Sequence, residues 1–300
     1  MSTKRDNVSR IKRSSPIGTS VFIGLRSLDV VLQCGILASG LADPFLNALH
    51  VSKVDSPVVA LGLPLKSLVI LFMAIGSSIK QSYALVFLSE QEMPVGSAVT
   101  IPVFNTVFNS VNSIMSLTAA ANAFTPLLLT ENDSGVSPLL VIGSVAYLIG
   151  LLTEVISEQQ RKAFKNNLKN AGKPFSGGLF GLARHINYGA YTLWRGAYAL
   201  ASGGWMWGIF VAGFFAKDFM DRGVPVLDEY CTKRYGASWA AQTPIYVQSF
   251  KDFKGEFKDA SEAYDAKSSG TCDNIIPPYL QLPDMSCNII RKATEPKSDT

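Results

Sequence analysis

Four long apolar stretches, each about as long as a membrane is thick, most strongly limit what this chain can fold into. They cover approximately residues 17–40, 57–79, 97–126 and 136–156. A membrane-spanning helix needs about 20 mostly apolar residues. Charged residues make up only 17% of the 300-residue chain, whereas roughly a quarter of the residues in soluble domains are charged. We therefore predict an all-α, polytopic membrane bundle.

Two shorter and more polar stretches follow, at about 187–202 and 204–220. Together with the first four they predict about six transmembrane helices. The chain starts with the basic sequence MSTKRDNVSRIKRSSP, but the next apolar stretch is long enough to span a membrane and lacks a clear small-residue cleavage site. We interpret it as the first transmembrane helix rather than a cleaved signal peptide.

The distribution of Lys and Arg predicts the orientation of these helices. Basic residues concentrate in residues 1–13 and 157–185, whereas the sequence LLLTENDSGVSP between the third and fourth stretches has acidic residues and no Lys or Arg. Because cytosolic loops are enriched in Lys and Arg, both basic segments, and with them both termini, are expected in the cytosol. The predicted division is a basic tail (1–16), a four-helix membrane block (17–156), a region with two membrane helices (157–247) and a cytosolic tail (248–300).

The first apolar stretch contains ionisable groups. Arg26, Asp29 and Gln33 follow a spacing of three and then four residues, which puts them on one face of a helix. Charges at that depth usually point into the bundle and pair with each other. They predict either an internal salt bridge that fixes helix packing or the polar lining of a cavity, in which Asp29 would be a candidate catalytic group.

An amide stripe runs along the third apolar stretch. Asn105, Asn109 and Asn112 fall on one helical face, and amides inside a membrane must be satisfied by other helices, water or a ligand. Asparagine can join helices, so this stripe predicts either interhelical contacts or a substrate-binding groove. Tyr83, just before this stretch, is expected at the membrane interface and is a candidate proton donor.

Hydrogen-bonding side chains cluster where the chain enters the fifth stretch. They are Arg184, His185, Asn187 and Tyr188. A helix N-terminus attracts anions, and an Arg beside it binds phosphate or carboxylate with two parallel hydrogen bonds. The simpler interpretation is that Arg184 follows the positive-inside bias while Asn187 caps the helix.

The C-terminal third resembles the DUF1295 and steroid 5-alpha-reductase-like membrane proteins, a superfamily shared with sterol reductases and isoprenylcysteine carboxyl methyltransferases. The resemblance covers roughly residues 154–247 and is carried by three segments. These are SEQQRKAFK, GLARHINYGAYTLWRGAYAL and GVPVLDEYCTKRYGASW. The matching positions are Glu158, Gln160, Arg161, Phe164-Lys165, Arg184-His185-Ile186-Asn187-Tyr188, Asp228-Glu229 and Arg234-Tyr235-Gly236.

The resemblance implies a cofactor pocket at the cytosolic surface of the membrane, with residues 157–247 on the cofactor side and residues 17–156 on the substrate side. In the reductases of this superfamily the cofactor is NADPH, and in the methyltransferases it is S-adenosylmethionine. The implied cofactor-binding residues are Lys165, Arg184, His185, Asn187, Tyr188, Trp194, Asp228, Glu229, Arg234 and Tyr235. The implied activity is NADPH-dependent reduction of a carbon–carbon double bond in a sterol, steroid or other lipid, in the endoplasmic reticulum.

Two alternatives stay open. The same pocket could hold S-adenosylmethionine for methylation of a lipid-linked substrate. The chain could also keep the fold without catalysis, because Ile186 stands where the family has Pro and Gly189-Ala190-Tyr191 replaces its Phe-Gly-Glu. Cofactor titration separates the three.

Other classes of function find little support in the sequence. The two histidines and four cysteines form no paired spacing, which argues against a zinc site. The net charge of +4 reflects membrane topology, and no basic-aromatic stripe indicates nucleic-acid binding. No protein partner can be inferred.

Overall fold

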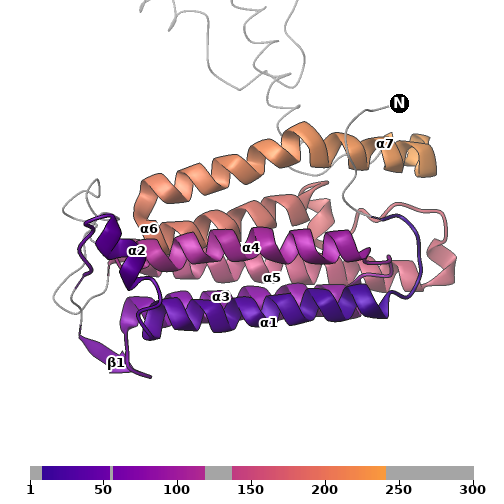
Figure 1. Cartoon of the computed structure of the whole chain (residues 1–300). Coiled ribbons are helices and arrows are strands. Elements are labelled where there is room, and N and C mark those ends of the chain that lie inside the picture. Colours follow the sequence, from indigo (N-terminus) through magenta and orange to yellow (C-terminus); the bar gives the residue numbers. More distant parts are fainter. Residues whose placement is uncertain (1–8, 55–56, 119–136, 241–300) are drawn as a thin grey trace, which may run out of the picture. The chain divides into compact units, whose positions relative to one another are not determined.

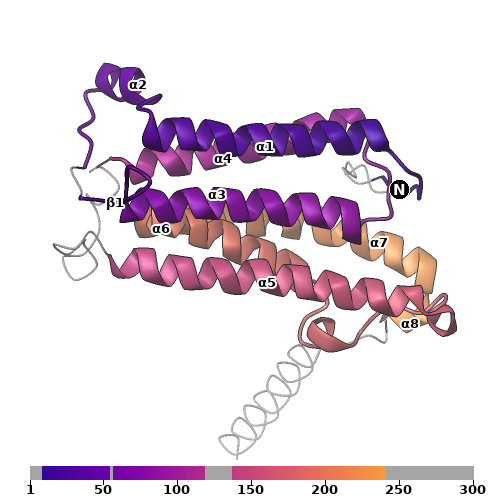
Figure 2. The same ribbon diagram turned by 90° about the horizontal axis from the view of Figure 1, so that it is seen from below.

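The computed structural model describes residues 9–54, 57–118 and 137–240. Five long helices run alongside one another in this part of the chain (Figure 1). They are α1 (Pro16–Ala38), α3 (Leu65–Tyr83), α4 (Val95–Ser116), α5 (Pro138–Asn166) and α6 (Ile186–Asp218). Seen from below, α3 lies between the α1–α4 pair and α5 (Figure 2). The prediction of an all-α membrane bundle is confirmed.

Short elements connect the long helices. A one-and-a-half-turn helix α2 (Asp43–Ala48) and an antiparallel pair of very short strands, β1 (Val58–Ala60) and β2 (Leu63–Pro64), join α1 to α3. The remaining short elements are the π-helices η1 (Ala84–Leu88) and η6 (Phe219–Gly223), the 3-10 helices η4 (Leu168–Asn170) and η5 (Gly178–Gly181), and the helices α7 (Val224–Tyr235) and α8 (Ala237–Ala240).

Four helical segments of the described chain are long and apolar enough to cross a membrane. They are Pro16–Ala38, Leu65–Leu88, Pro138–Asn166 and Ile186–Tyr235. The six-helix count is not confirmed, since α4 does not reach this apolarity and the two last predicted stretches fall within the single segment Ile186–Tyr235. Helix α4 is 22 residues long, which is enough to span a membrane, but its three asparagines lower its apolarity. The end of the third predicted stretch, 119–126, lies outside the described residues, as does the predicted tail 248–300.

Helix α6 folds back on itself at Gly204. The backbone there has φ 80° and ψ −177°, a conformation that only glycine adopts easily. Residues far apart along α6 consequently meet: a Cβ atom added to Gly196 would lie 2.7 Å from the Cβ of Ala212. The two arms match the two shorter apolar stretches of the sequence, and the second arm returns the chain to the end of the bundle where α6 begins.

Helices α5 and α6 approach each other through small residues. A Cβ atom on Gly150 would lie 2.7 Å from the backbone nitrogen of Trp194 and 2.9 Å from the carbonyl oxygen of Ala190. Gly143, two turns away, would meet the carbonyl oxygen of Ala197 at 2.8 Å. Small residues let helix backbones come close in membranes, where van der Waals packing drives association. This contact fixes the first arm of α6 against the bundle.

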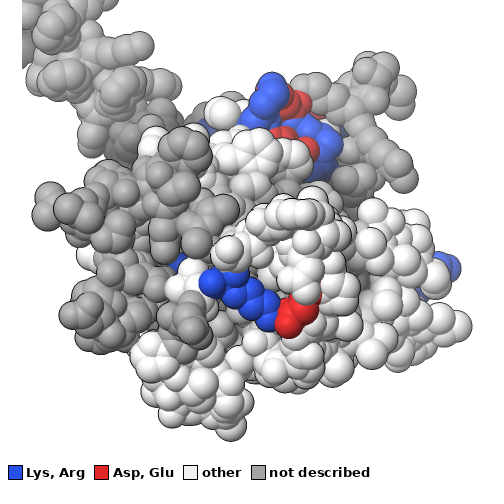
Figure 3. Space-filling model, turned by 60° about the vertical axis from the view of Figure 1, so that its left-hand side comes forward, with Lys and Arg blue, Asp and Glu red and all other residues white. Residues whose placement is uncertain are grey.

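The bundle carries apolar side chains outside and many polar ones inside. Large apolar side chains such as Leu28, Val31 and Val145 are more than half exposed, and uncharged residues cover nearly all of the described surface in Figure 3. Buried polar side chains include Arg26, Asp29 and others treated below. This distribution suits lipid rather than water as the surrounding medium.

The connections at one end of the bundle are held together by ion pairs. Lys12 pairs with Glu90, and Arg13 Nη2 lies 2.7 Å from Glu92 Oε2. The hydrogen bond from Lys12 lowers the pKa of Glu90 below its ordinary value. Lys162 of α5 donates to the carbonyl oxygen of Phe87. The starts of α1, α4 and α6 and the ends of α3 and α5 therefore share this end.

Candidate functional site

The residues around the start of α6 form a partly buried polar pocket, here called the vestibule. It consists of Glu158 from α5, His185, Asn187 and Tyr188 from the start of α6, and Asp228 from α7. The amide Nδ2 of Asn187 donates to Glu158 Oε1 at 3.0 Å. His185 Nε2 lies 3.3 Å from Asp228 Oδ1. The return arm of α6 thus brings α7 opposite the residues that begin α6.

Aromatic rings line one side of the vestibule. The ring of Tyr188 stacks on Phe219 with centroids 4.4 Å apart and planes 8° from parallel. His185 stacks on the same tyrosine at 5.7 Å and 7°. The guanidinium carbon of Arg184 lies 4.9 Å from the centre of the Trp239 ring. A flat heterocycle could extend such a stack.

Three buried polar atoms of the vestibule have no hydrogen-bond partner among the described residues. They are Asn187 Oδ1, His185 Nδ1 and Asp228 Oδ1, the last of which lies 3.3 Å from His185 Nε2. Burial lowers the pKa of His185 below its ordinary value, with a smaller opposing contribution from Asp228. The imidazole is therefore neutral near pH 7 and can accept a hydrogen bond at Nδ1 if Nε2 carries the proton. Unpaired buried atoms are costly, so a ligand that offers donors would fit here.

Four further predicted cofactor residues lie at the end of α5 and on α7. Lys165 is exposed on the last turn of α5, Glu229 accepts a hydrogen bond from Lys233 Nζ at 2.7 Å, and exposed Arg234 donates to the Tyr230 hydroxyl at 2.6 Å. Tyr235, half-buried, lies beneath the Arg234 guanidinium at 5.6 Å. These residues stay candidates for the rim of the vestibule.

Trp194 occupies the protein core instead of the vestibule. It is fully buried and donates from Nε1 to Glu154 Oε2 at 2.7 Å. Seven residues separate it from Asn187, which is about 10 Å along a helix. Trp194, which the resemblance implied as a cofactor residue, therefore lies two turns deeper than the vestibule.

Asp29 lies at the centre of a buried hydrogen-bond network between α1, α3 and α4. Its Oδ2 atom lies 2.6 Å from Arg26 Nη1 and accepts from Asn109 Nδ2 at 2.7 Å, while Oδ1 accepts from Gln33 Nε2 at 2.8 Å. Arg26 also donates to Ser77 on α3 at 3.1 Å. The internal salt bridge predicted from the sequence is therefore present.

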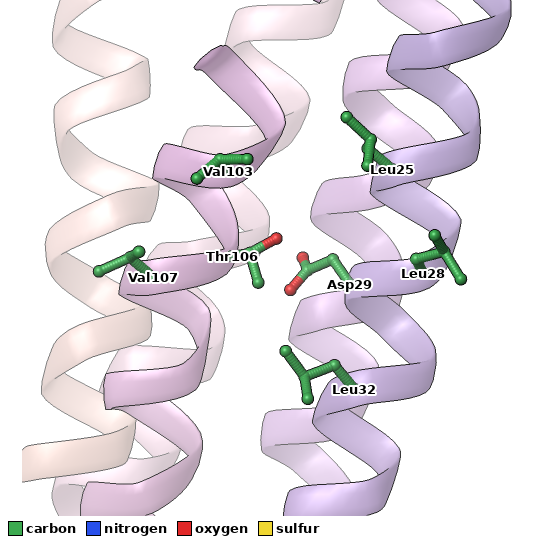
Figure 4. A pocket seen from close by; sticks show the side chains of 7 residues that line it. All are labelled: Leu25, Leu28, Asp29, Leu32, Val103, Thr106 and Val107. Atoms are coloured by element: carbon green, nitrogen blue, oxygen red, sulfur yellow. The ribbon is translucent and has the colours of Figure 1, made fainter. Parts of the chain in front are cut away.

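Asp29 is also one of two polar residues that line a groove between α1 and α4; the other is Thr106. The groove has a volume of about 330 Å³, and its other lining residues, shown in Figure 4, are Leu25, Leu28, Leu32, Val103, Thr106 and Val107. Figure 4 shows the carboxylate of Asp29 pointing across to α4, toward Thr106. An apolar groove with two polar side chains could admit an apolar ligand from the lipid.

The three asparagines of α4 join it to α1, α3 and both arms of α6. Asn105 Oδ1 accepts from Gln81 Nε2 of α3 at 2.9 Å and from Arg195 of the first arm of α6. Asn109 binds Asp29 of α1, and Asn112 Oδ1 accepts from Trp207 Nε1 of the second arm at 2.7 Å. The stripe therefore joins helices, and only the Oδ1 atom of Asn109 is left without a partner among its described neighbours.

A second buried ion pair joins α3 and α5. Lys80 pairs with Glu154, and its ammonium lies 5.6 and 5.5 Å from the ring centres of Tyr191 and Trp194. Tyr83, one turn further along α3, accepts a hydrogen bond from Gln159 Nε2 at 2.8 Å. No hydrogen bond joins Tyr83 to Asp29 in the described parts of the chain, so the two candidate catalytic groups belong to separate clusters.

Sequence reasoning did not assign roles to Glu158, Lys80, Glu154 or Arg195. Lys80, Glu154 and Arg195 are charged residues within otherwise apolar helices, a signal that often marks a functional position. Glu158 was recognised as a motif position without a role. The described residues contain no group of three His, Cys, Asp or Glu side chains that could hold a metal ion.

Comparison with known proteins identifies relatives of this chain. The family model described as "Protein of unknown function (DUF1295)" matches residues 90–242. The "Probable O-methyltransferase ustE" of Ustilaginoidea virens is 38% identical over 232 residues, which is 74% of this chain and 81% of that protein. No solved structure matches significantly. The chain belongs to the DUF1295 family.

Proposed function

We propose that this protein is a membrane-embedded methyltransferase that uses S-adenosylmethionine to methylate an oxygen of an apolar, lipid-like substrate. The observation that carries the proposal is the 38% identity to a protein named a probable O-methyltransferase, over most of both chains. Fold alone does not determine activity, so the proposal also depends on whether the vestibule suits the cofactor.

The vestibule suits a ligand that brings positive charge and hydrogen-bond donors. S-adenosylmethionine carries a sulfonium and an ammonium group against one carboxylate, and its ribose offers hydroxyl donors. Asp228 and Asn187 Oδ1 would hold the ammonium or the ribose, and Tyr188 with Phe219 would hold the adenine ring. His185 Nδ1 can accept a further hydrogen bond. When bound, the cofactor supplies an electrophilic methyl group.

NADPH fits this charge distribution less well. Its pyrophosphate and 2′-phosphate carry several negative charges, which proteins bind with available cations. Here Arg161 pairs with Glu158, His185 faces Asp228, and Arg184 lies over Trp239. Reduction of a lipid double bond stays the second candidate, because the Arg184–Tyr188 motif resembles that of the reductases.

The helical block and the vestibule would have separate roles. In this proposal residues 17–156 shape the substrate side, including the groove between α1 and α4, and residues 157–247 bind the cofactor. The chain's own residues then orient two ligands and exclude water between them, which supplies much of the rate acceleration in such reactions. Residence in the endoplasmic reticulum with cytosolic termini, and Tyr83 or Asp29 as a proton-transfer group, are part of the same proposal.

Cofactor titration of the full-length protein in detergent tests the proposal. We expect calorimetry to detect binding of S-adenosylmethionine and not of NADPH. Asp228→Asn and Asn187→Leu should each weaken that binding by about tenfold or more, as expected for hydrogen bonds to charged groups. Asp218→Asn, which removes a carboxylate paired with Arg222 on the second arm of α6, is the matched control and should bind normally.

The alternatives give different results. Binding of NADPH alone would replace the methyltransferase with the reductase. Binding of neither cofactor would support a non-catalytic protein, consistent with Ile186 and Gly189-Ala190-Tyr191. Normal affinity of both vestibule variants for S-adenosylmethionine would move the cofactor site elsewhere.

A further inference from the structure

Arg195 is a buried cation whose side chain is incompletely satisfied. It is 2% exposed. Its Nη2 and Nε atoms donate to the Tyr191 hydroxyl at 3.1 Å, and Nη2 also donates to Asn105 Oδ1. Its third nitrogen, Nη1, is buried and has no hydrogen-bond partner among the described residues. Leaving a charged donor buried and unpaired is costly.

The charges in the interior of the described bundle do not balance around Arg195. Arg26 pairs with Asp29, and Lys80 pairs with Glu154. Arg195 makes no ion pair with a carboxylate within the described residues; it lies instead 4.5 Å from the centre of the Trp194 ring and 5.4 Å from that of Phe215. Aromatic faces stabilise a cation only partly. The interior therefore holds a positive charge without its anion.

A second unsatisfied atom belongs to the same cluster. Gln81 donates from Nε2 to the Asn105 oxygen that also accepts from Arg195, and its own Oε1 atom is buried without a partner in the described chain. One charged donor and one acceptor are thus both open around a single asparagine. A ligand oxygen could accept from Arg195 Nη1 and, while still protonated, donate to Gln81 Oε1.

We propose that Arg195, with Asn105, Tyr191 and Gln81, forms an interior binding site for an acidic oxygen, a carboxylate or a phenolate, on an apolar substrate. Burial in an apolar bundle selects the hydrocarbon part of such a ligand, and the unpaired positive charge selects the acidic oxygen over an aliphatic hydroxyl.

This site would hold the methyl acceptor of the proposed methyl transfer. Its role in catalysis therefore rests on the proposed function. Arg195 lies eight residues beyond Asn187, which is about 12 Å along α6. Tyr191 lies between them, with its ring 5.6 Å from Phe219 of the vestibule and its hydroxyl on Arg195. Arg195 would favour the ionised form of the acceptor oxygen, with its proton released to solvent. This form is the nucleophile, and transfer of the methyl group to it would leave S-adenosylhomocysteine. A phenol or carboxylic acid can ionise near neutral pH in such a site, whereas an aliphatic alcohol cannot.

Equilibrium dialysis of the full-length protein in detergent tests this site with three probes of twelve carbons each. The probes are dodecanoate, 4-hexylphenol and 1-dodecanol. Wild-type protein should bind at least one acidic probe about tenfold or more tightly than dodecanol. In Arg195→Gln that preference should fall to within about twofold, while affinity for S-adenosylmethionine stays at the wild-type level. Arg13→Gln, which removes an exposed arginine, is the control and should keep the preference.

An unchanged preference in Arg195→Gln, or no preference in the wild type, would overturn the proposal and leave Arg195 a structural cation. If that variant does not fold, Arg195→Lys decides, since it keeps the charge but loses the planar fork; its preference should fall several-fold, and an unchanged one contradicts the site. Arg195-dependent acid binding without any binding of S-adenosylmethionine would remove the proposed function and keep this site. The opposite result would remove the site and keep the function.

Discussion

Asp29 shows how single residues hold this bundle together from within. Its two oxygen atoms accept hydrogen bonds from two neighbours on its own helix, Arg26 and Gln33, and from Asn109 on α4. Both members of the Arg26–Asp29 pair are fully buried. These donors use most of the hydrogen-bonding capacity of the carboxylate, which favours a structural role. A catalytic role stays open because Asp29 also lines the groove between α1 and α4.

Replacing Asp29 separates the two roles. Asp29→Ala leaves Arg26 buried without its anion and should lower the free energy of unfolding by about 3–5 kcal/mol, measured by denaturant titration in detergent. Asp218→Ala removes a half-exposed pair with Arg222 and should cost less than about 1 kcal/mol. A stability loss no larger than the control's would contradict the structural role. Asp29→Asn that keeps stability but loses activity would establish a catalytic one.

Helices α5 and α6 approach each other so closely that a side chain at Gly150 would meet the backbone of α6. Their contact positions both the vestibule, through Glu158 and Asn187, and the core, through Glu154 and Trp194. Any side chain at Gly150 would press on the backbone of α6, which cannot move without shifting these pairs.

Gly150→Ala should therefore destabilise the protein. We expect a loss of about 1–3 kcal/mol, the usual cost of overpacking, because the new methyl group would meet backbone atoms of Ala190 and Trp194. Gly213→Ala has open space around the new methyl group and should leave stability unchanged or raise it by up to about 1 kcal/mol. Equal effects of the two substitutions in thermal unfolding would show that α5 and α6 are not in this contact.

The sequence predicts where helices lie and which residues share a helical face. It predicts less well which helices contact each other and how deep in the bundle a residue lies. The spacing of Asp29 with Arg26, and of the asparagines on α4, correctly identifies residues that share a face. It could not show that Asn105 binds α3 and α6 together, since that depends on how separate helices pack. The family resemblance likewise implied Trp194 as a cofactor residue but could not show that it lies two turns deeper than the vestibule.

The described bundle as a whole gathers its polar connections at one end. The segment before α1, the connection from α3 to α4 and the loop from α5 to α6 meet there through contacts such as Arg13 with Glu92 and Lys162 with Phe87. The α2 segment and the β1–β2 pair lie at the other end (Figure 1). The described residues of both basic segments, 9–13 and 157–185, lie at this end, which stays the predicted cytosolic side.

Accessibility to a membrane-impermeant maleimide tests this arrangement. In a variant with all four native cysteines replaced by serine, single cysteines at Ser14 and Ser176 should be labelled from the same side of sealed vesicles. A cysteine at Asn47, exposed on α2, should react only after the membrane is permeabilised. Labelling of positions 14 and 47 from one side would contradict the orientation of α1 across the membrane.

The reversal at Gly204 affects how this protein can be made. His185 and Asn187 are synthesised and inserted before the ribosome reaches Asp228, and the two walls meet only when the return arm has folded back. A nascent chain that stalls within that arm would have His185 and Asn187 in place but would lack Asp228. If the vestibule binds the proposed cofactor, only a chain that has completed this return arm can bind it.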